Sequence, residues 1–155
     1  MPVIVWAEGG CFKTGTFYQP YLTEIASHGY LILANGPPVG GPPKTVADFG
    51  KLMNLGQNKI SDLQDSINWA MKGNGAKYGN IDTARIAAGG QSCGGTEALS
   101  ISYHNDQVKL TFLVNSGALN PNSRVWLKEL KYPVAYFNGG PKDIAYKNVS
   151  SVHVF

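Results

Sequence analysis

Five short apolar runs alternate with helical stretches along the 155 residues, and this alternation constrains the fold more than any other feature. The runs are nearly continuous in apolar residues, as in parallel strands that are covered on both faces. They lie at residues 2–6, 30–34, 85–88, 109–114 and 133–137. Strands that alternate with helices in this way predict an α/β fold, with a mostly parallel sheet of about five strands and helices on both faces.

The clearest helix is predicted at residues 59–72, where apolar side chains recur along a single stripe. Those side chains are Ile60, Leu63, Ile67, Ala70 and Met71. Further helices are predicted at residues 17–28, 94–103 and 124–131. The stretch rich in glycine and proline at 36–43 is predicted to be a loop, because strong helix and strand patterns continue after it. No repeat or linker divides the chain, which predicts a single domain over residues 1–155.

Charge and composition exclude two classes of partner. The 13 basic and 10 acidic residues give a net charge of +3, and the basic residues are scattered, unlike the clustered charge of a nucleic-acid-binding surface. No run of about 18 apolar residues is present, so no membrane span is predicted. No pattern of metal ligands or cofactor motif is found, and no cofactor is implied. A dinucleotide-binding role is disfavoured, because the first strand runs into Glu8-Gly9-Gly10-Cys11 and not into G-x-G-x-x-G.

The stretch that points to chemistry is Gly90-Gln91-Ser92-Cys93-Gly94, which lies between a predicted strand and a predicted helix. This is the G-x-S-x-G pattern in the strand–turn–helix context that a nucleophilic serine requires. The turn strains the serine backbone, so the residues two positions to either side must lack a Cβ atom. A structural glycine turn is the alternative reading of the same five residues.

With these residues the chain resembles the α/β-hydrolase superfamily, in its dienelactone-hydrolase and polyester-hydrolase (cutinase-like) branch. The likeness runs from residue 2 to about residue 148. The resemblance implies that residues 2–10 form a strand and its oxyanion loop, that 22–33 form a helix and strand, that 90–95 form the turn of the nucleophile, and that 132–143 form a strand and its acid loop. Dienelactone hydrolases carry cysteine at the nucleophile position, where this chain has Ser92 followed by Cys93.

The resemblance also assigns roles to other residues of the site. An acyl-transfer enzyme needs preorganised N–H donors for the developing oxyanion. One donor is expected to be the backbone N–H of Cys93, and the second that of Gly10 or Cys11. Asp143 matches the position of the triad acid, whose carboxylate would orient a histidine. A glycine turn and a turn aspartate are the plain alternatives.

The chain has two cysteines, Cys11 and Cys93, which follow strands expected to be neighbours in the sheet. Both would lie at the carboxyl edge, close to Ser92. A disulfide between them is geometrically plausible, and two small buried thiols are the alternative.

The general base is the difficulty, because a serine is a weak nucleophile without one. His28 precedes a strand and is expected at the opposite edge of the sheet. His104 ends the helix after Ser92, roughly 15–18 Å from it at about 1.5 Å per residue. His153 is therefore the candidate base, although it follows Asp143 by fewer residues than in relatives. The resemblance thus assigns Ser92 and Asp143, and His153 is the histidine that remains for the triad. The alternative is that His153 is incidental and that the histidine of the family is missing.

The two ends of the chain differ from the family pattern. Strands that the family has before residue 2 and after residue 148 are not found, so the chain is expected to be a short form. Met1-Pro2 leads directly into a predicted strand, so no signal peptide is expected in this chain. Secretion of a longer form stays open, and Asn148 then matches a glycosylation acceptor. Exposed sheet edges would favour self-association.

The sequence therefore predicts a serine hydrolase that acts on small carboxylic esters, with weak or no activity if the histidine is missing. The alternative is a non-catalytic α/β-hydrolase remnant that binds a ligand, a glycan or a protein partner. The substrate is expected to be apolar or aromatic in its acyl group, given the aromatic residues near the predicted site.

Overall fold

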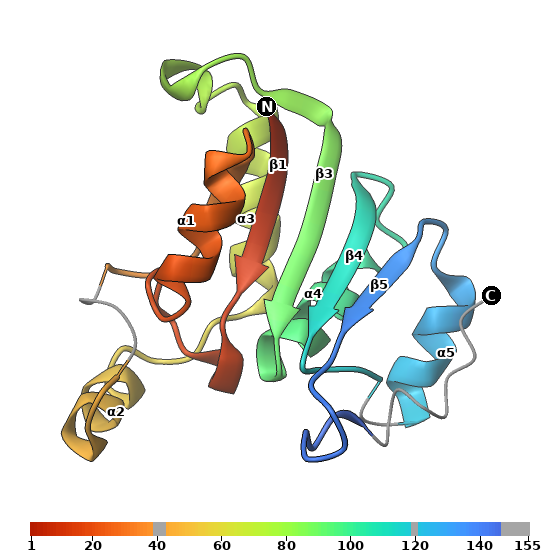
Figure 1. Cartoon of the computed structure of the whole chain (residues 1–155). Coiled ribbons are helices and arrows are strands. Elements are labelled where there is room, and N and C mark those ends of the chain that lie inside the picture. The colour runs from red at the N-terminus through yellow and green to blue at the C-terminus, as the bar shows by residue number, and fades with distance from the viewer. Residues whose placement is uncertain (39–42, 119–120, 147–155) are drawn as a thin grey trace.

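A computed structural model describes residues 1–38, 43–118 and 121–146 of the chain. Its centre is a five-stranded sheet in which all neighbouring strands run parallel, in the order β2-β1-β3-β4-β5. The strands are β1 (Pro2–Ala7), β2 (Leu31–Ala34), β3 (Asp82–Gln91), β4 (Val108–Val114) and β5 (Val134–Phe137). In Figure 1 the labelled strands β1, β3, β4 and β5 point toward the lower edge of the molecule. This confirms the α/β class and the parallel five-stranded sheet predicted from the apolar runs.

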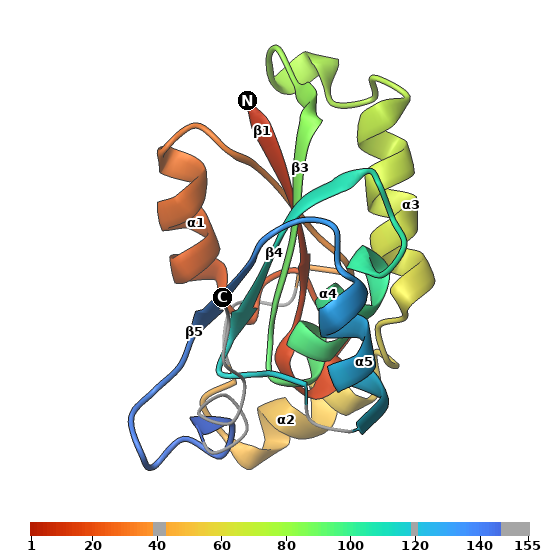
Figure 2. The same ribbon diagram turned by 90° about the vertical axis from the view of Figure 1, so that its right-hand side faces the viewer.

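Helices cover both faces of this sheet, as Figure 2 shows from the side. Helix α1 (Gln19–Ser27) lies on one face, and α3 (Ile60–Met71), α4 (Cys93–Ser102) and α5 (Pro121–Glu129) lie on the other. Two short 3-10 turns, Gly9–Cys11 and Ala76–Tyr78, precede α1 and β3 respectively. Right-handed crossovers between parallel strands require such a layered arrangement.

The core forms on both sides of β1, because successive side chains of a strand point to opposite faces. Val3, Val5 and Ala7 pack with α3 and α4, in a cluster that includes Leu63 and Leu99. The alternate residues Ile4 and Trp6 face α1 and pack against Leu22 and Phe112. Val3, Val5 and Trp6 are fully buried, so the near-continuous apolar run reflects a strand that is covered on both faces.

Helix α2 (Val46–Met53) was not predicted from the sequence. It begins with a capping box in which the Thr45 hydroxyl accepts from the Asp48 amide at 3.2 Å and Asp48 Oδ2 accepts from the Thr45 amide at 3.1 Å. Leu52 is buried, whereas the apolar residues Val46, Phe49 and Met53 are exposed. Figure 1 shows this helix near the end of the sheet to which the strands point.

The register places the last residues of the five strands along one edge. Ala34 pairs with Trp6, Ala7 with Gly90, Gln91 with Val114, and Val114 with Phe137. Strand β3 extends to Gln91, beyond the predicted end at residue 88, because Gly89 and Gly90 continue the ladder. The segments that follow β1, β3, β4 and β5 therefore meet at the carboxyl edge, where parallel α/β sheets bind ligands.

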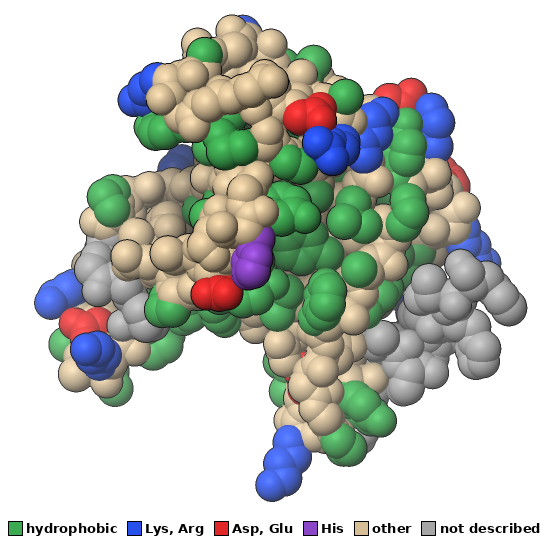
Figure 3. Space-filling model, turned by 45° about the horizontal axis from the view of Figure 1, so that its top comes forward, with side chains coloured by type: hydrophobic (Ala, Val, Ile, Leu, Met, Phe, Trp, Pro, Cys, Tyr) green, Lys and Arg blue, Asp and Glu red, His purple; other side chains and the backbone are tan. Residues whose placement is uncertain are grey.

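The face that carries α1 is only partly covered. A hollow of about 810 Å³ opens between α1 and the strands. Figure 3 shows hydrophobic side chains gathered in a depression on the surface of the molecule. The lining of the hollow includes Tyr21, Ile25, Leu110, Phe112 and Phe137. Pro2 and Lys109, near the starts of their strands, also line it, so the hollow runs along the face of the sheet from the strand starts to Phe137 at the end of β5. Within the described ranges, no helix is long and apolar enough to span a membrane.

Candidate active site

Ser92 lies in the turn between β3 and α4, with φ 51° and ψ −118°. A non-glycine residue adopts such a backbone only where its surroundings fix it. Here the Ser92 amide donates to the carbonyl of Val114 at 3.0 Å, and its carbonyl accepts from the hydroxyl of Ser116 at 2.6 Å. The Gly95 amide donates to the same carbonyl at 3.0 Å. The turn is therefore held from the neighbouring strand and from the helix that follows.

The two glycines of the pattern are required by close contacts. A Cβ atom on Gly90 would lie 2.2 Å from the carbonyl oxygen of Gly94. A Cβ atom on Gly94 would lie 2.1 Å from the carbonyl oxygen of Ala7, at the end of β1. Both contacts involve backbone atoms that cannot move aside cheaply. The spacing of the pattern thus has the steric cause that the sequence suggests.

Backbone donors lie on both sides of this turn. Cys93 is the first residue of the ten-residue helix α4, and the first N–H groups of a helix have no partner within it. In the loop after β1, the Cys11 amide donates to the carbonyl of Glu8 at 3.2 Å. The Gly10 amide has no acceptor among the residues that the structure describes. Of the two alternatives for the second donor, the hydrogen bonds therefore favour Gly10.

A disulfide joins Cys11 to Cys93, with their Cα atoms 5.2 Å apart. It connects the loop after β1 to the first residue of α4 across 82 positions of sequence. Cys11 itself has a positive φ of 51°, a conformation that the cross-link helps to hold. The loop and the turn of Ser92 therefore form one linked unit.

Glu8 is a buried carboxyl group directly after β1, and only 1% of its surface is exposed. Neither of its carboxylate oxygens has a hydrogen-bond partner among the described residues. Burial raises the pKa of Glu8 to about 7, and the nearby indole N–H of Trp6 and the amides of Tyr18 and Phe17 offset this only in part. Nothing in the sequence resemblance indicates such a buried acid.

Asp143 lies in the loop after β5 and accepts three hydrogen bonds. The Ala145 amide donates to Oδ1 at 3.0 Å, while the Gly139 amide and the Asn115 side chain donate to Oδ2 at 3.0 and 2.6 Å. The bond from Ala145, followed by those from Gly139 and Asn115, lowers the pKa of Asp143. The carboxylate is thereby kept ionised and fixed in direction, which is what the acid of a triad requires.

Two of the three histidines, His28 and His104, make their contacts away from Ser92. His28 lines the hollow on the α1 face, with Pro2 and Arg85. The ring of His104 stacks on Tyr103, and its Nε2 lies 3.1 Å from Oε2 of Glu129. His153 and Asn148, the candidate base and the glycosylation acceptor, lie outside the described residues. The described part of the chain thus brings Ser92, Cys93, Gly10 and Asp143 to one edge and supplies no histidine there.

Sequence reasoning missed two residues that support the site. Asn115 follows β4 with a positive φ of 45° and links Asp143 to the edge of the sheet. Ser116 is fully buried and donates to the Ser92 carbonyl. The signal that was available is Asn-Ser-Gly directly after a buried strand, a combination that favours a turn at a functional edge.

Comparison with known proteins adds no assignment: no protein-family model matches the chain, and no curated protein matches it. Within the described residues, no group of three or more His, Cys, Asp or Glu side chains is placed to hold a metal ion.

Proposed function

We propose that this protein is a serine hydrolase of the α/β-hydrolase type, acting on carboxylic esters with Ser92 as nucleophile. The observation that carries the proposal is the strained backbone of Ser92 at the junction of β3 and α4. Close backbone contacts there exclude a Cβ atom at positions 90 and 94. Strained backbone of this kind clusters at active sites. The resemblance in sequence pattern supports the same reading.

In this reaction the Ser92 hydroxyl oxygen attacks the ester carbonyl carbon and gives up its proton to a base. The carbonyl oxygen becomes an oxyanion that accepts from the amides of Cys93 and Gly10. Collapse of this intermediate expels the alcohol, which takes the proton back from the base. Water then releases the acid from the acyl-enzyme in the same two stages. Asp143 orients the base, for which His153 is the candidate in this chain.

Hydrolysis of p-nitrophenyl acetate tests this proposal. We expect turnover above the buffer rate that Ser92→Ala lowers to background, while Ser61→Ala, at an exposed serine of α3, leaves it unchanged. If His153 supplies the base, His153→Ala abolishes turnover as well. If it does not, hydrolysis is slow because Ser92 lacks a base, Ser92→Ala still removes it, and His153→Ala has little effect. Turnover that survives Ser92→Ala contradicts the proposal.

A second candidate function is non-catalytic binding of a ligand, a glycan or a protein partner. It is favoured by one observation, which is that neither histidine of the described residues lies beside Ser92. A protein that only binds would give no hydrolysis above buffer in the same assay, and Ser92→Ala would then leave the rate unchanged.

A further inference from the structure

The loop after β1 is held by a second connection besides the disulfide. Residues Gly56–Asn58 run antiparallel to it, with an isolated bridge between Phe12 and Gln57. The Lys13 amide donates to the carbonyl of Gly56 at 3.2 Å, and the Asn58 amide donates to the carbonyl of Cys11 at 2.7 Å. The segment before α3 thus fixes the backbone of the loop that carries the Gly10 amide.

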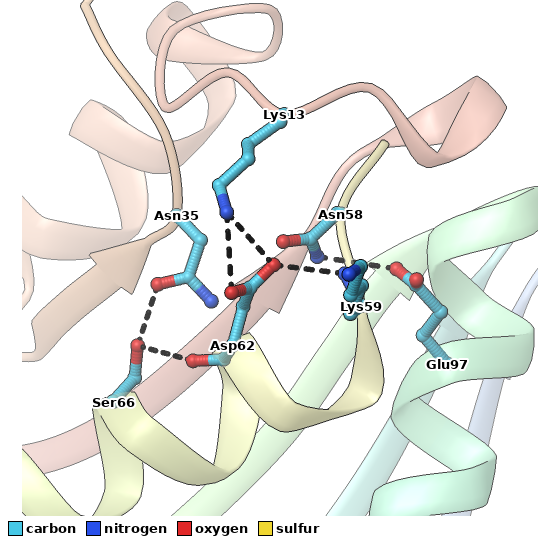
Figure 4. A network of polar contacts seen from close by, with 7 residues as sticks. All are labelled: Lys13, Asn35, Asn58, Lys59, Asp62, Ser66 and Glu97. Carbon is cyan, nitrogen blue, oxygen red and sulfur yellow. Dashed lines mark hydrogen bonds and ion pairs between the residues drawn. The ribbon is translucent and has the colours of Figure 1, made fainter. Parts of the chain in front are cut away.

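The side chain of Asn58 continues this connection to the helix after Ser92. Its Nδ2 donates to Oε2 of Glu97 at 3.2 Å, and Glu97 lies five residues after Ser92 in α4. Figure 4 shows the two side chains pointing toward each other from the segment before α3 and from α4. Asn58 and Glu97 are 5% and 8% exposed, so water does not compete for this hydrogen bond.

The Glu97 carboxyl group depends on Asn58 for its hydrogen bond. Burial raises the pKa of Glu97, the hydrogen bond from Asn58 lowers it in part, and the charge of Asp62 raises it further. A buried carboxyl group that loses its donor is left unsatisfied, which is costly. The contact therefore has a strongly preferred geometry, and it links the two parts of the site that supply backbone donors.

The other polar link to the loop is weaker. Nζ of Lys13 lies 3.2 Å from Oδ1 of Asp62 in α3, but the Lys13 side chain is 39% exposed. Solvent screens such a pair, so it holds the loop less firmly than a buried hydrogen bond does. It also reaches α3 and not the helix that begins after Ser92. In Figure 4 the Lys13–Asp62 pair is separate from the bond between Asn58 and Glu97.

We infer that Asn58 is a positioning residue of the proposed esterase: it sets the spacing between the Gly10 amide in the loop after β1 and the Cys93 amide in α4. The inference rests on the proposed function for its catalytic consequence. Asn58 acts through other groups: its backbone amide holds the carbonyl of Cys11, and its side chain holds Glu97. Oxyanion donors must be preorganised, and displacement by about 1 Å can cost up to about 100-fold in rate.

Swapping the amide and the carboxyl group between positions 58 and 97 tests the positioning role of Asn58. Asn58→Asp keeps the shape of residue 58 and its backbone bond, but it sets a carboxylate against Glu97. We expect kcat for p-nitrophenyl acetate to fall by roughly 10- to 100-fold with little change in KM. Adding Glu97→Gln to this variant supplies an amide that donates to the new carboxylate at position 58, and the double variant should recover most of kcat. Glu97→Gln alone retains an oxygen that accepts from Asn58 and is the reference for the double variant.

Hydrogen exchange of the amides at residues 9–13 gives a readout that does not depend on activity. Exchange there should be faster in Asn58→Asp and return toward the original rate in the double variant. If Asn58→Asp does not fold, Glu97→Met removes the acceptor from the other side and should show the same two effects. Unchanged exchange in the folded single variant overturns the inference, as does a loss of kcat that Glu97→Gln does not restore.

The two proposals fail in different ways. If the unaltered protein shows no turnover that depends on Ser92, the proposed function is overturned. Faster exchange in Asn58→Asp would then still show that Asn58 positions the loop. The claim that Asn58 affects an esterase rate would be overturned together with the proposed function. Turnover that depends on Ser92, together with a kcat unaffected by Asn58→Asp, overturns the positioning role alone.

Discussion

Glycines at positions 90 and 94 leave room for the turn of Ser92 by bringing backbone atoms together. The start of α4 passes so close to the end of β1 that a Cβ atom on Gly94 would also lie 2.7 Å from the carbonyl oxygen of Glu8. The same Glu8 carbonyl accepts a hydrogen bond from the Cys11 amide. A single added carbon at position 94 would therefore disturb both the loop and the turn.

Gly94→Ala should destabilise the fold by about 2–3 kcal/mol, because the backbone atoms it meets must shift. The matched control is Gly50→Ala in α2, where an added Cβ meets no atom within 4 Å. That control should stabilise by up to about 1 kcal/mol, as alanine favours helix over glycine. Urea denaturation measures both. Equal stability of the two variants would show that the contact at Gly94 is not tight.

The buried carboxyl of Glu8 makes stability depend on pH. Its pKa in the folded protein, about 7, lies above its ordinary value of 4.5, so folding favours the protonated form. The protein is therefore most stable below pH 4.5 with respect to this group, and the contribution is lost as pH rises toward 7. At about 1.4 kcal/mol for each pH unit between those values, the loss is about 3 kcal/mol.

Glu8→Gln should remove this dependence, because the amide cannot ionise. We expect the variant to be more stable than the original protein at about pH 8.5 and similar to it at about pH 4.5. Denaturation midpoints at the two pH values check this. A parallel pH dependence in both proteins would contradict the assignment to Glu8.

At the scale of elements, the loop after β1 and helix α4 are joined by the disulfide between Cys11 and Cys93. A cross-link that closes 82 positions of sequence restricts the unfolded chain strongly, and such bonds typically contribute about 2–4 kcal/mol. The link also holds Cys11 at its positive φ. The loop and the helix therefore depend on the oxidation state of these two sulfurs.

Reduction of the disulfide should lower the denaturation midpoint by an amount that corresponds to about 2–4 kcal/mol. A variant that replaces both cysteines by serine should match the reduced protein and should not respond to reductant. Thiol titration establishes that reduction is complete. A reduced protein as stable as the oxidised one would mean that the other loop contacts suffice.

The strands and most helices could be predicted from the sequence because their apolar patterns follow from burial. Helix α2 could not, because Leu52 is its one buried large apolar residue, while Val46 is 89% exposed and Met53 69%, so no continuous apolar stripe indicates it. The Thr45–Asp48 capping box was the signal available for its start. Ser92 and Asp143 could be placed by local pattern. The bond between Asn58 and Glu97 could not, since it joins residues 39 positions apart through tertiary packing alone.

Across the whole molecule, the sheet is covered on the face of α3, α4 and α5 and partly bare on the face of α1. Leu110 and Phe137 are 38% and 57% exposed beside the hollow. Exposed apolar surface of this kind favours association. Self-association stays a prediction, and this face, together with β2 and β5 at the two edges of the described sheet, is the surface that would take part in it.

Light scattering over a range of concentrations should show a mass that rises with concentration. Leu110→Lys should suppress this rise, because it places a charge on the apolar face. Ile60→Lys is the matched control, since Ile60 is exposed to a similar degree on α3, on the other face. A strictly monomeric protein at high concentration would contradict the expectation.

The central claim is that the fold presents Ser92 as the reactive group. A fluorophosphonate tests this directly, because a nucleophilic serine oxygen forms a bond to phosphorus and releases fluoride and a proton. Peptide mapping by mass spectrometry after partial reaction locates the adduct. The account predicts one adduct, on Ser92, that forms faster than at any other serine and is absent from Ser92→Ala. Modification of Ser61 and other exposed serines at the same rate as Ser92, or no adduct on Ser92, would contradict it.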